Sequence, residues 1–91
     1  MFKGKTDSGF EYEVNEKKLN DMRFVELLRK SDENPLYSVD LFSYLLGEEG
    51  KEALYKHLED EDGIVPPDAA EKEFVQIMEA AGEKYNEVKN S

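Results

Sequence analysis

The sequence contains no cysteine. Without cysteine there is no disulfide framework and no thiolate chemistry, which suits a protein of a reducing compartment. Long hydrophobic runs are also missing, because no 18-residue apolar span occurs and Met1 to Lys5 lacks the apolar run of a signal peptide. We therefore expect a soluble chain that stays where it is made and has no membrane partner.

Basic side chains are few relative to acidic ones. Twelve Lys and Arg stand against twenty-two Asp and Glu, which gives a net charge of −10. Proteins bind nucleic acids and anionic membranes largely by neutralising phosphates with Lys and Arg. The charge therefore predicts no nucleic-acid partner, and leaves basic proteins or apolar grooves of other proteins as candidates.

The hydrophobic residues are clustered and periodic, so the 91 residues are expected to fold as one domain, 1–91. Phe10, Tyr12 and Val14 alternate with two glutamates at the two-residue period of a strand, after the turn cluster Asp7-Ser8-Gly9. This pattern predicts a β-hairpin over 2–14.

Capping residues, glycine and proline divide the rest of the chain into helices. Asn15 is suited to cap the first helix, Gly47 separates the second from the third, and Asp68 opens the fourth. The predicted ranges are 15–30, 36–46, 48–59 and 68–85, followed by a frayed tail at 86–91. The expected fold class is mainly α, a small bundle of about four helices with a short N-terminal β-hairpin.

The stretch from Leu36 to Leu46 organises this scheme. Its residues are mostly apolar or aromatic, and at ~100° per residue they point in every direction around a helix. A domain this small has difficulty covering such a helix on all sides. We therefore predict an exposed apolar patch, ringed by acidic residues, that binds another protein. The candidate residues are Tyr37, Leu41, Phe42, Tyr44 and Leu45.

A calcium loop is the first chemical alternative. The segment Asp60-Glu61-Asp62-Gly63 is similar to part of the D-x-D-x-D-G pattern. With Gly63 at the sixth loop position, Leu58 and Ala69 fall where carboxylates are required. An acidic turn with a left-handed glycine is the simpler interpretation.

Catalytic patterns are equally sparse. His57 is the only histidine, and a metal or acid–base site would need further ligands or a nucleophile. Ser8 and Ser43 lack a nucleophile-elbow context, and the carboxylate pairs at 48–49 and 59–62 would need a cleft. We expect a non-enzyme with no cofactor, no metal and no catalytic residue.

Four segments carry a family resemblance. They are 1–14, Leu19-Asn20-Asp21, Leu45 to Glu49, and Leu54 to Pro66. In order and local sequence they resemble the small tail assembly chaperones of long-tailed, non-contractile phages and their prophages, over nearly the whole chain.

The resemblance implies a predominantly helical, non-catalytic protein of the host cytoplasm. Such chaperones coat the long, helical, aggregation-prone tape measure protein, recruit tail tube subunits and leave before the tail is complete. In many relatives a ribosomal frameshift appends a second domain, so this chain would be the short product. Coating a long partner also favours a homo-oligomer, because many weak contacts then add along one chain.

The acidity supports an alternative function. An acidic adaptor or DNA mimic would use the same charge to occupy a basic protein. Binding of that kind collapses as salt screens the surface charges, whereas binding through apolar surface persists.

Overall fold

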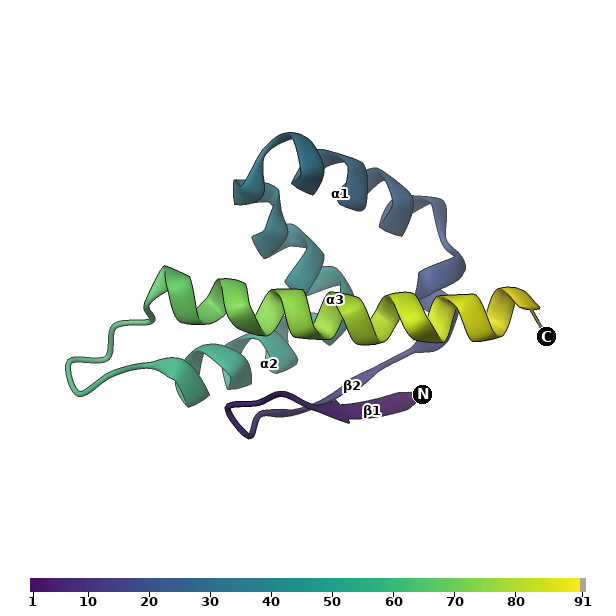
Figure 1. Cartoon of the computed structure of the whole chain (residues 1–91). Coiled ribbons are helices and arrows are strands. Elements are labelled where there is room, and N and C mark those ends of the chain that lie inside the picture. The colour runs from purple at the N-terminus through teal and green to yellow at the C-terminus, as the bar shows by residue number, and fades with distance from the viewer. Residues whose placement is uncertain (91) are drawn as a thin grey trace.

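The computed structural model describes residues 1–90, and the side chains of residues 1–86. The elements in order are strands β1 (Phe2–Lys5) and β2 (Glu11–Val14), the 3-10 segment η1 (Glu16–Asn20), helix α1 (Met22–Glu33), the 3-10 segment η2 (Pro35–Tyr37), and helices α2 (Ser38–Leu58) and α3 (Pro67–Asn90). In Figure 1, α3 crosses the molecule as a long rod, with the hairpin on one side and α1 on the other. The prediction of a mainly helical chain with an N-terminal hairpin is confirmed.

The hairpin follows the alternation in the sequence. β1 and β2 are antiparallel, with Phe2 opposite Val14 and Lys5 opposite Glu11. Tyr12 and Val14 are buried while the intervening glutamates are exposed. Gly9 closes the turn with φ of 92°, a conformation that glycine adopts without steric strain. The hairpin thus lays one apolar face on the helices.

Three α-helices are present among the described residues, rather than the four expected. Most of the predicted helices 36–46 and 48–59 forms the single element α2, which is kinked at Gly47 with φ of 77° and ψ of 166°. Leu36 and Tyr37 lie in the 3-10 segment η2 instead, and Glu59 caps the C-terminal end of α2. No loop separates the two halves, because Leu46 and Glu48 on either side of the glycine are both helical. Gly47 itself has non-helical φ and ψ, so it is the junction at which two helical halves meet without a loop.

The predicted helix 15–30 is divided at Asp21. Asn15 does cap a helical segment, but that segment is the short η1. Asp21 adopts an extended conformation, and its side chain accepts the backbone N–H of Arg23 at the start of α1. A second helix-capping residue inside the run therefore breaks it into two elements.

The last helix is longer than expected. It begins at Pro67, with Asp68 in its first turn, and extends to Asn90, beyond the predicted end at 85. Of the predicted frayed tail at 86–91, Ser91 lies outside the described residues.

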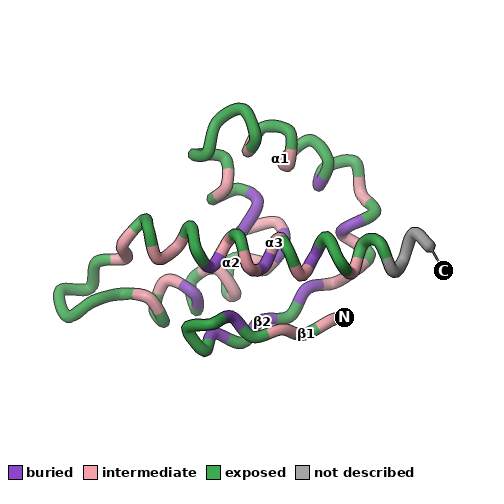
Figure 2. Tube along the Cα trace, viewed as in Figure 1, coloured by how far each residue is buried: buried purple, intermediate pink, exposed green. Residues whose placement is uncertain are grey.

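The core draws on every element except β1 and η2. Figure 2 shows the buried residues concentrated in β2, α2 and α3, and a largely exposed α1. Of the twelve residues of α1, all of them described, Phe24 alone is fully buried. The buried hydrophobic residues are Phe10, Tyr12, Val14, Leu19, Phe24, Leu41, Phe42, Leu45, Leu54, Ile77 and Ala81. Among the described residues, helix α1 therefore contributes the fewest buried side chains of the three helices.

Replacement of Gly47 by alanine tests the kink. We expect Gly47→Ala to lower the free energy of unfolding by about 1–3 kcal/mol, because its φ and ψ lie where residues with a Cβ are strained. A new Cβ there meets no atom within 4 Å, so the effect is conformational and not steric. Chemical denaturation provides the measurement.

Gly82→Ala is the matched control. A Cβ at Gly82 also meets no atom within 4 Å, but this glycine lies inside α3 without a positive φ. It should raise stability by roughly 0.5–1 kcal/mol. Stabilisation by both changes would mean that the kink does not need glycine.

Candidate functional site

Three of the five predicted contact residues lie in the core. Leu41, Phe42 and Leu45 are at most 3% exposed. The Phe42 ring packs edge-on against Phe74 of α3, with 4.9 Å between ring centroids. In this conformation these side chains hold α2 to the rest of the molecule and present nothing to a partner. Periodicity alone could not separate them from exposed residues, because the stretch is apolar all around.

Tyr44 is partly buried and fastens α1 to α2. Its ring stacks on Phe24, with centroids 6.5 Å apart, and its hydroxyl donates to the Asp21 carboxylate. Burial, reinforced by Asp21, raises the pKa of Tyr44 to about 12. The Tyr44 hydroxyl and the Arg23 backbone N–H lower the pKa of Asp21. The N-cap of α1 is thus bonded directly to α2.

Tyr37 is the one predicted contact residue that is exposed, and it belongs to an apolar corner formed by Leu36, Tyr37 and Val39. These side chains are 79%, 40% and 43% exposed, respectively. The ammonium of Lys30 lies 5.8 Å from the centre of the Tyr37 ring. The predicted under-covered stretch therefore exposes its N-terminal end, where it leaves η2 and enters α2.

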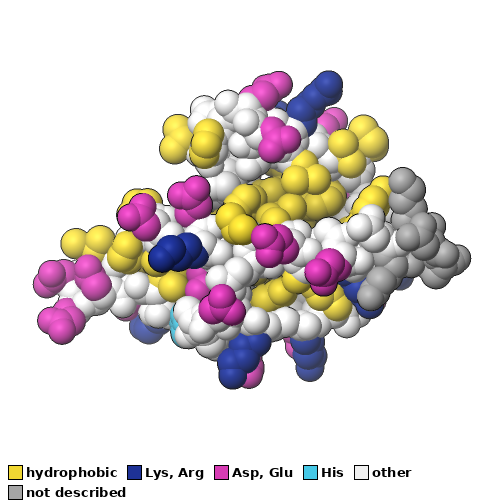
Figure 3. Space-filling view, in the orientation of Figure 1, with side chains coloured by type: hydrophobic (Ala, Val, Ile, Leu, Met, Phe, Trp, Pro, Cys, Tyr) yellow, Lys and Arg dark blue, Asp and Glu magenta, His cyan; other side chains and the backbone are white. Residues whose placement is uncertain are grey.

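A second apolar surface lies between α1 and α3. Figure 3 shows hydrophobic side chains gathered there, with carboxylates around them. We call this surface the apolar band. Its partly buried members are Leu27 and Leu28 of α1 and Phe74 and Met78 of α3, and its exposed member is Val75 of α3, on the side facing the gap. Because α1 packs mainly on α2 and the 3-10 segments, its inner stripe is incompletely covered by α3.

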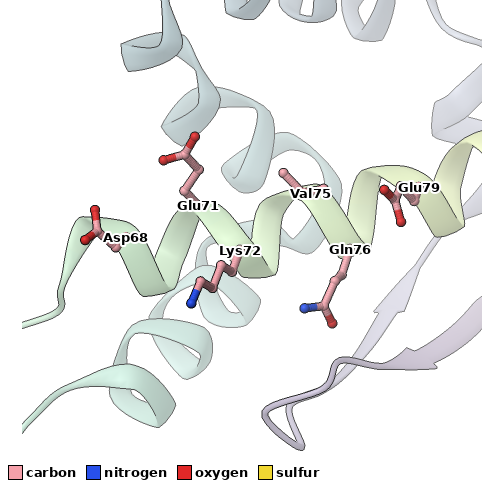
Figure 4. Close-up of a pocket in the computed structure, with 6 residues that line it drawn as sticks. All are labelled: Asp68, Glu71, Lys72, Val75, Gln76 and Glu79. Atoms are coloured by element: carbon pink, nitrogen blue, oxygen red, sulfur yellow. The ribbon is translucent and has the colours of Figure 1, made fainter.

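Acidic residues border this band along α3. Figure 4 shows Asp68, Glu71 and Val75 projecting from the edge of α3 that faces α1 and the first half of α2, while Lys72 and Gln76 project from the opposite edge. Glu79 continues the row one helical turn beyond Val75. These six residues line an open depression along a single helix. This depression lies on the surface, and its side chains do not converge on an enclosed cavity.

A polar cluster that the sequence did not suggest ties the hairpin turn to both long helices. The Ser8 hydroxyl donates to Glu73 of α3 and lies 3.1 Å from Nε2 of His57 on α2. Nearby, the Asp7 backbone N–H donates to Oε1 of Gln76 at 2.7 Å. Ser8 is 49 and 65 residues from its two partners, so no local motif could have revealed the cluster.

Serine, histidine and a carboxylate in contact call for comparison with a catalytic triad. In a triad the carboxylate orients the histidine, which in turn activates the serine. Here Glu73 accepts from Ser8 instead, and the second Nε2 contact of His57 is the Ser8 carbonyl oxygen at 3.1 Å. The arrangement is that of a structural tie between three elements.

The segment 60–63 is an acidic turn with a left-handed glycine, which is the simpler of the two interpretations of its sequence. Oδ1 of Asp60 accepts the backbone N–H groups of Asp62 and Ile64, at 2.8 and 3.0 Å, so it is occupied in closing the turn. Gly63 has φ of 76°. Among the described residues, no three His, Asp or Glu side chains are grouped so that they could hold a metal ion.

Comparison of the chain with protein-family models, with curated proteins and with solved structures gave no match. Within the described residues, no helix combines the length and apolar character needed to cross a membrane. The assignment of function therefore depends on the surfaces described above and on the sequence resemblance.

Tyr44→Phe tests the bond between α1 and α2. The variant keeps the ring but loses the bond to Asp21, so its melting temperature should fall at neutral pH. Because the pKa of Asp21 is lowered in the folded state, the difference from the unchanged protein should shrink as the pH falls below 3.8. Because the pKa of Tyr44 is raised, the difference should also shrink as the pH rises from 10 toward 12. A difference independent of pH would contradict this assignment.

Ser8→Ala tests the polar cluster. Glu73 is 2% exposed, and its Oε2 has no hydrogen-bond partner among the described residues. Removing the Ser8 hydroxyl takes away the partner of the other oxygen, which should lower stability by about 1–3 kcal/mol.

The same change in a Glu73→Met background should be nearly neutral, because no buried carboxylate is then left unpaired. Denaturation of the four proteins of this cycle measures the coupling. Equal losses in both backgrounds would show that Ser8 does not act through Glu73.

Proposed function

We propose that this chain is a phage tail assembly chaperone. It binds the tape measure protein, helps to recruit tail tube subunits in the host cytoplasm, and catalyses no reaction. The resemblance of four segments to that family motivates the proposal. Its physical support comes from the exposed surface.

The observation that carries the proposal is apolar surface left open on a strongly acidic helical domain. The apolar corner at Leu36 and Val39 is exposed, and the apolar band between α1 and α3 is only partly buried. Exposed apolar surface rimmed by charge is typical of a protein-binding site. A carrier of an aggregation-prone helical protein needs such a surface for capture, together with net charge that keeps the complex dispersed.

An acidic adaptor or DNA mimic is the second candidate. Its support is the concentration of carboxylates at 59–62, which lies at the exposed tip between α2 and α3 (Figure 3). Such a protein would bind a basic partner through charge, so the two functions differ in their dependence on salt.

Co-expression with the large helical protein encoded downstream tests the chaperone function. We expect that protein to be soluble only when this chain is present, and the complex to survive purification in high salt because apolar contacts carry it. A double variant, Leu36→Gln with Val39→Gln, should fold normally and retain less partner. Ile64→Gln is the control, since Ile64 is 59% exposed but lies in the connector before α3.

A downstream protein that is soluble alone and does not bind this chain would overturn the proposal. Binding to a basic protein that is lost in high salt would favour the acidic adaptor instead.

A further inference from the structure

We infer that the apolar band between α1 and α3 binds one amphipathic helix whose apolar stripe is flanked by Lys or Arg. The inference rests on the proposed function in one respect, namely that the partner is helical. It adds the position of the site, the length of helix that it accepts and the charge that the partner carries.

The shape of the surface indicates a helical occupant. The band is bounded by two helices that do not cover each other, and its floor is α2, whose Phe42 meets Phe74. Val75 is 46% exposed beside this contact, although its neighbours in the band are partly buried. An elongated apolar strip between helices is the kind of surface on which an amphipathic helix lays its apolar face.

Charge identifies the chemistry of the occupant. Asp68 and Glu71 project from the edge of α3 that carries Val75, whereas Lys72 projects from the opposite edge (Figure 4). Glu79 follows Val75 by about one helical turn and lines the same depression. Residues on α1 carry both signs, including Glu26 and Arg29. A basic flank on the partner would therefore face α3. An acidic helix, or a second copy of this chain with its net charge of −10, would be repelled.

The acidic row also sets a length. Asp68 and Glu79 are eleven residues apart on one continuous helix, which corresponds to about 16 Å. A partner helix of roughly three turns would match the row. Longer helical proteins would be bound one such segment at a time.

The test uses the full chain and two synthetic 18-residue amphipathic peptides. Both carry leucine at the same helical positions, and the polar positions are lysine in one peptide and glutamate in the other. Fluorescence anisotropy of labelled peptide measures the dissociation constant. We expect the leucine–lysine peptide to bind at least about tenfold more tightly than the leucine–glutamate peptide.

Variants then place the site. Val75→Gln should weaken binding of the leucine–lysine peptide about tenfold, the loss expected when one valine is no longer buried. Ile64→Gln, at a similarly exposed residue outside the band, should leave it unchanged. Equal effects of the two substitutions would overturn the inference.

Charge reversal tests the acidic row. Glu71→Lys with Glu79→Lys should weaken the leucine–lysine peptide and strengthen the leucine–glutamate peptide. The matched control is Glu49→Lys with Glu52→Lys, two exposed residues of α2. Each Glu→Lys change adds two charges, so both double variants shift the net charge from −10 to −6. The same loss in both variants would mean that overall charge and not this row attracts the peptide, and would overturn the inference.

Three further outcomes have definite meanings. Equal binding of both peptides would contradict the charge assignment. Concentration-dependent dimerisation of the chain alone, abolished by Val75→Gln in sedimentation, would make a second copy the occupant and overturn the inference. Failure of both peptides to bind, with retention of the co-expressed downstream protein, would overturn this site while leaving the chaperone proposal standing.

Discussion

The bend of α2 at Gly47 is the constraint on which the other contacts depend. Before the bend, Tyr44 stacks on Phe24 of α1 and Phe42 packs against α3. After it, His57 lies against Phe10 of the hairpin, with 5.6 Å between ring centroids. A straight helix of this length would carry one of these ends away from its partners, because each residue advances the axis by 1.5 Å. A single residue that adopts a positive φ thus lets one helix serve two sides of a small core.

Side-chain hydrogen bonds hold together elements that the small hydrophobic core does not fix by packing alone. Ser8 and Glu73 hold the hairpin turn to α3, and Asp21 and Tyr44 hold the start of α1 to α2. Beyond its first turn, α1 has no fully buried side chain among its described residues. Helix α1 packs mainly on α2 and on the 3-10 segments before and after it, so its inner stripe remains partly open beside α3. The apolar band follows from this arrangement.

The sequence predicted the elements better than their junctions. The alternation of Phe10, Tyr12 and Val14 defines the hairpin, and Gly47 marks the correct site of the bend. The expectation of two separate helices on either side of Gly47 was only partly right, because the helical halves follow each other without a loop across the non-helical glycine. The break at Asp21 was missed because Asn15 offered an equally good cap earlier in the same run. Contacts between residues far apart in the chain, such as Ser8 with Glu73, leave no local pattern at all.

The sequence could not predict which residues of the central stretch are buried, for a related reason. A helix that is apolar all around does not indicate which side will be covered, so Leu41 and Leu45 could not be distinguished from Leu36 and Val39. Tertiary packing decides this, and it leaves the N-terminal end exposed. The same packing sets Glu71 beside the exposed Val75 on the edge of α3. Apolar contact would supply affinity, while the carboxylates favour a basic partner over a like-charged copy of the chain. Homo-oligomers of this protein would therefore need either a different surface or a bound partner whose positive charge offsets the repulsion.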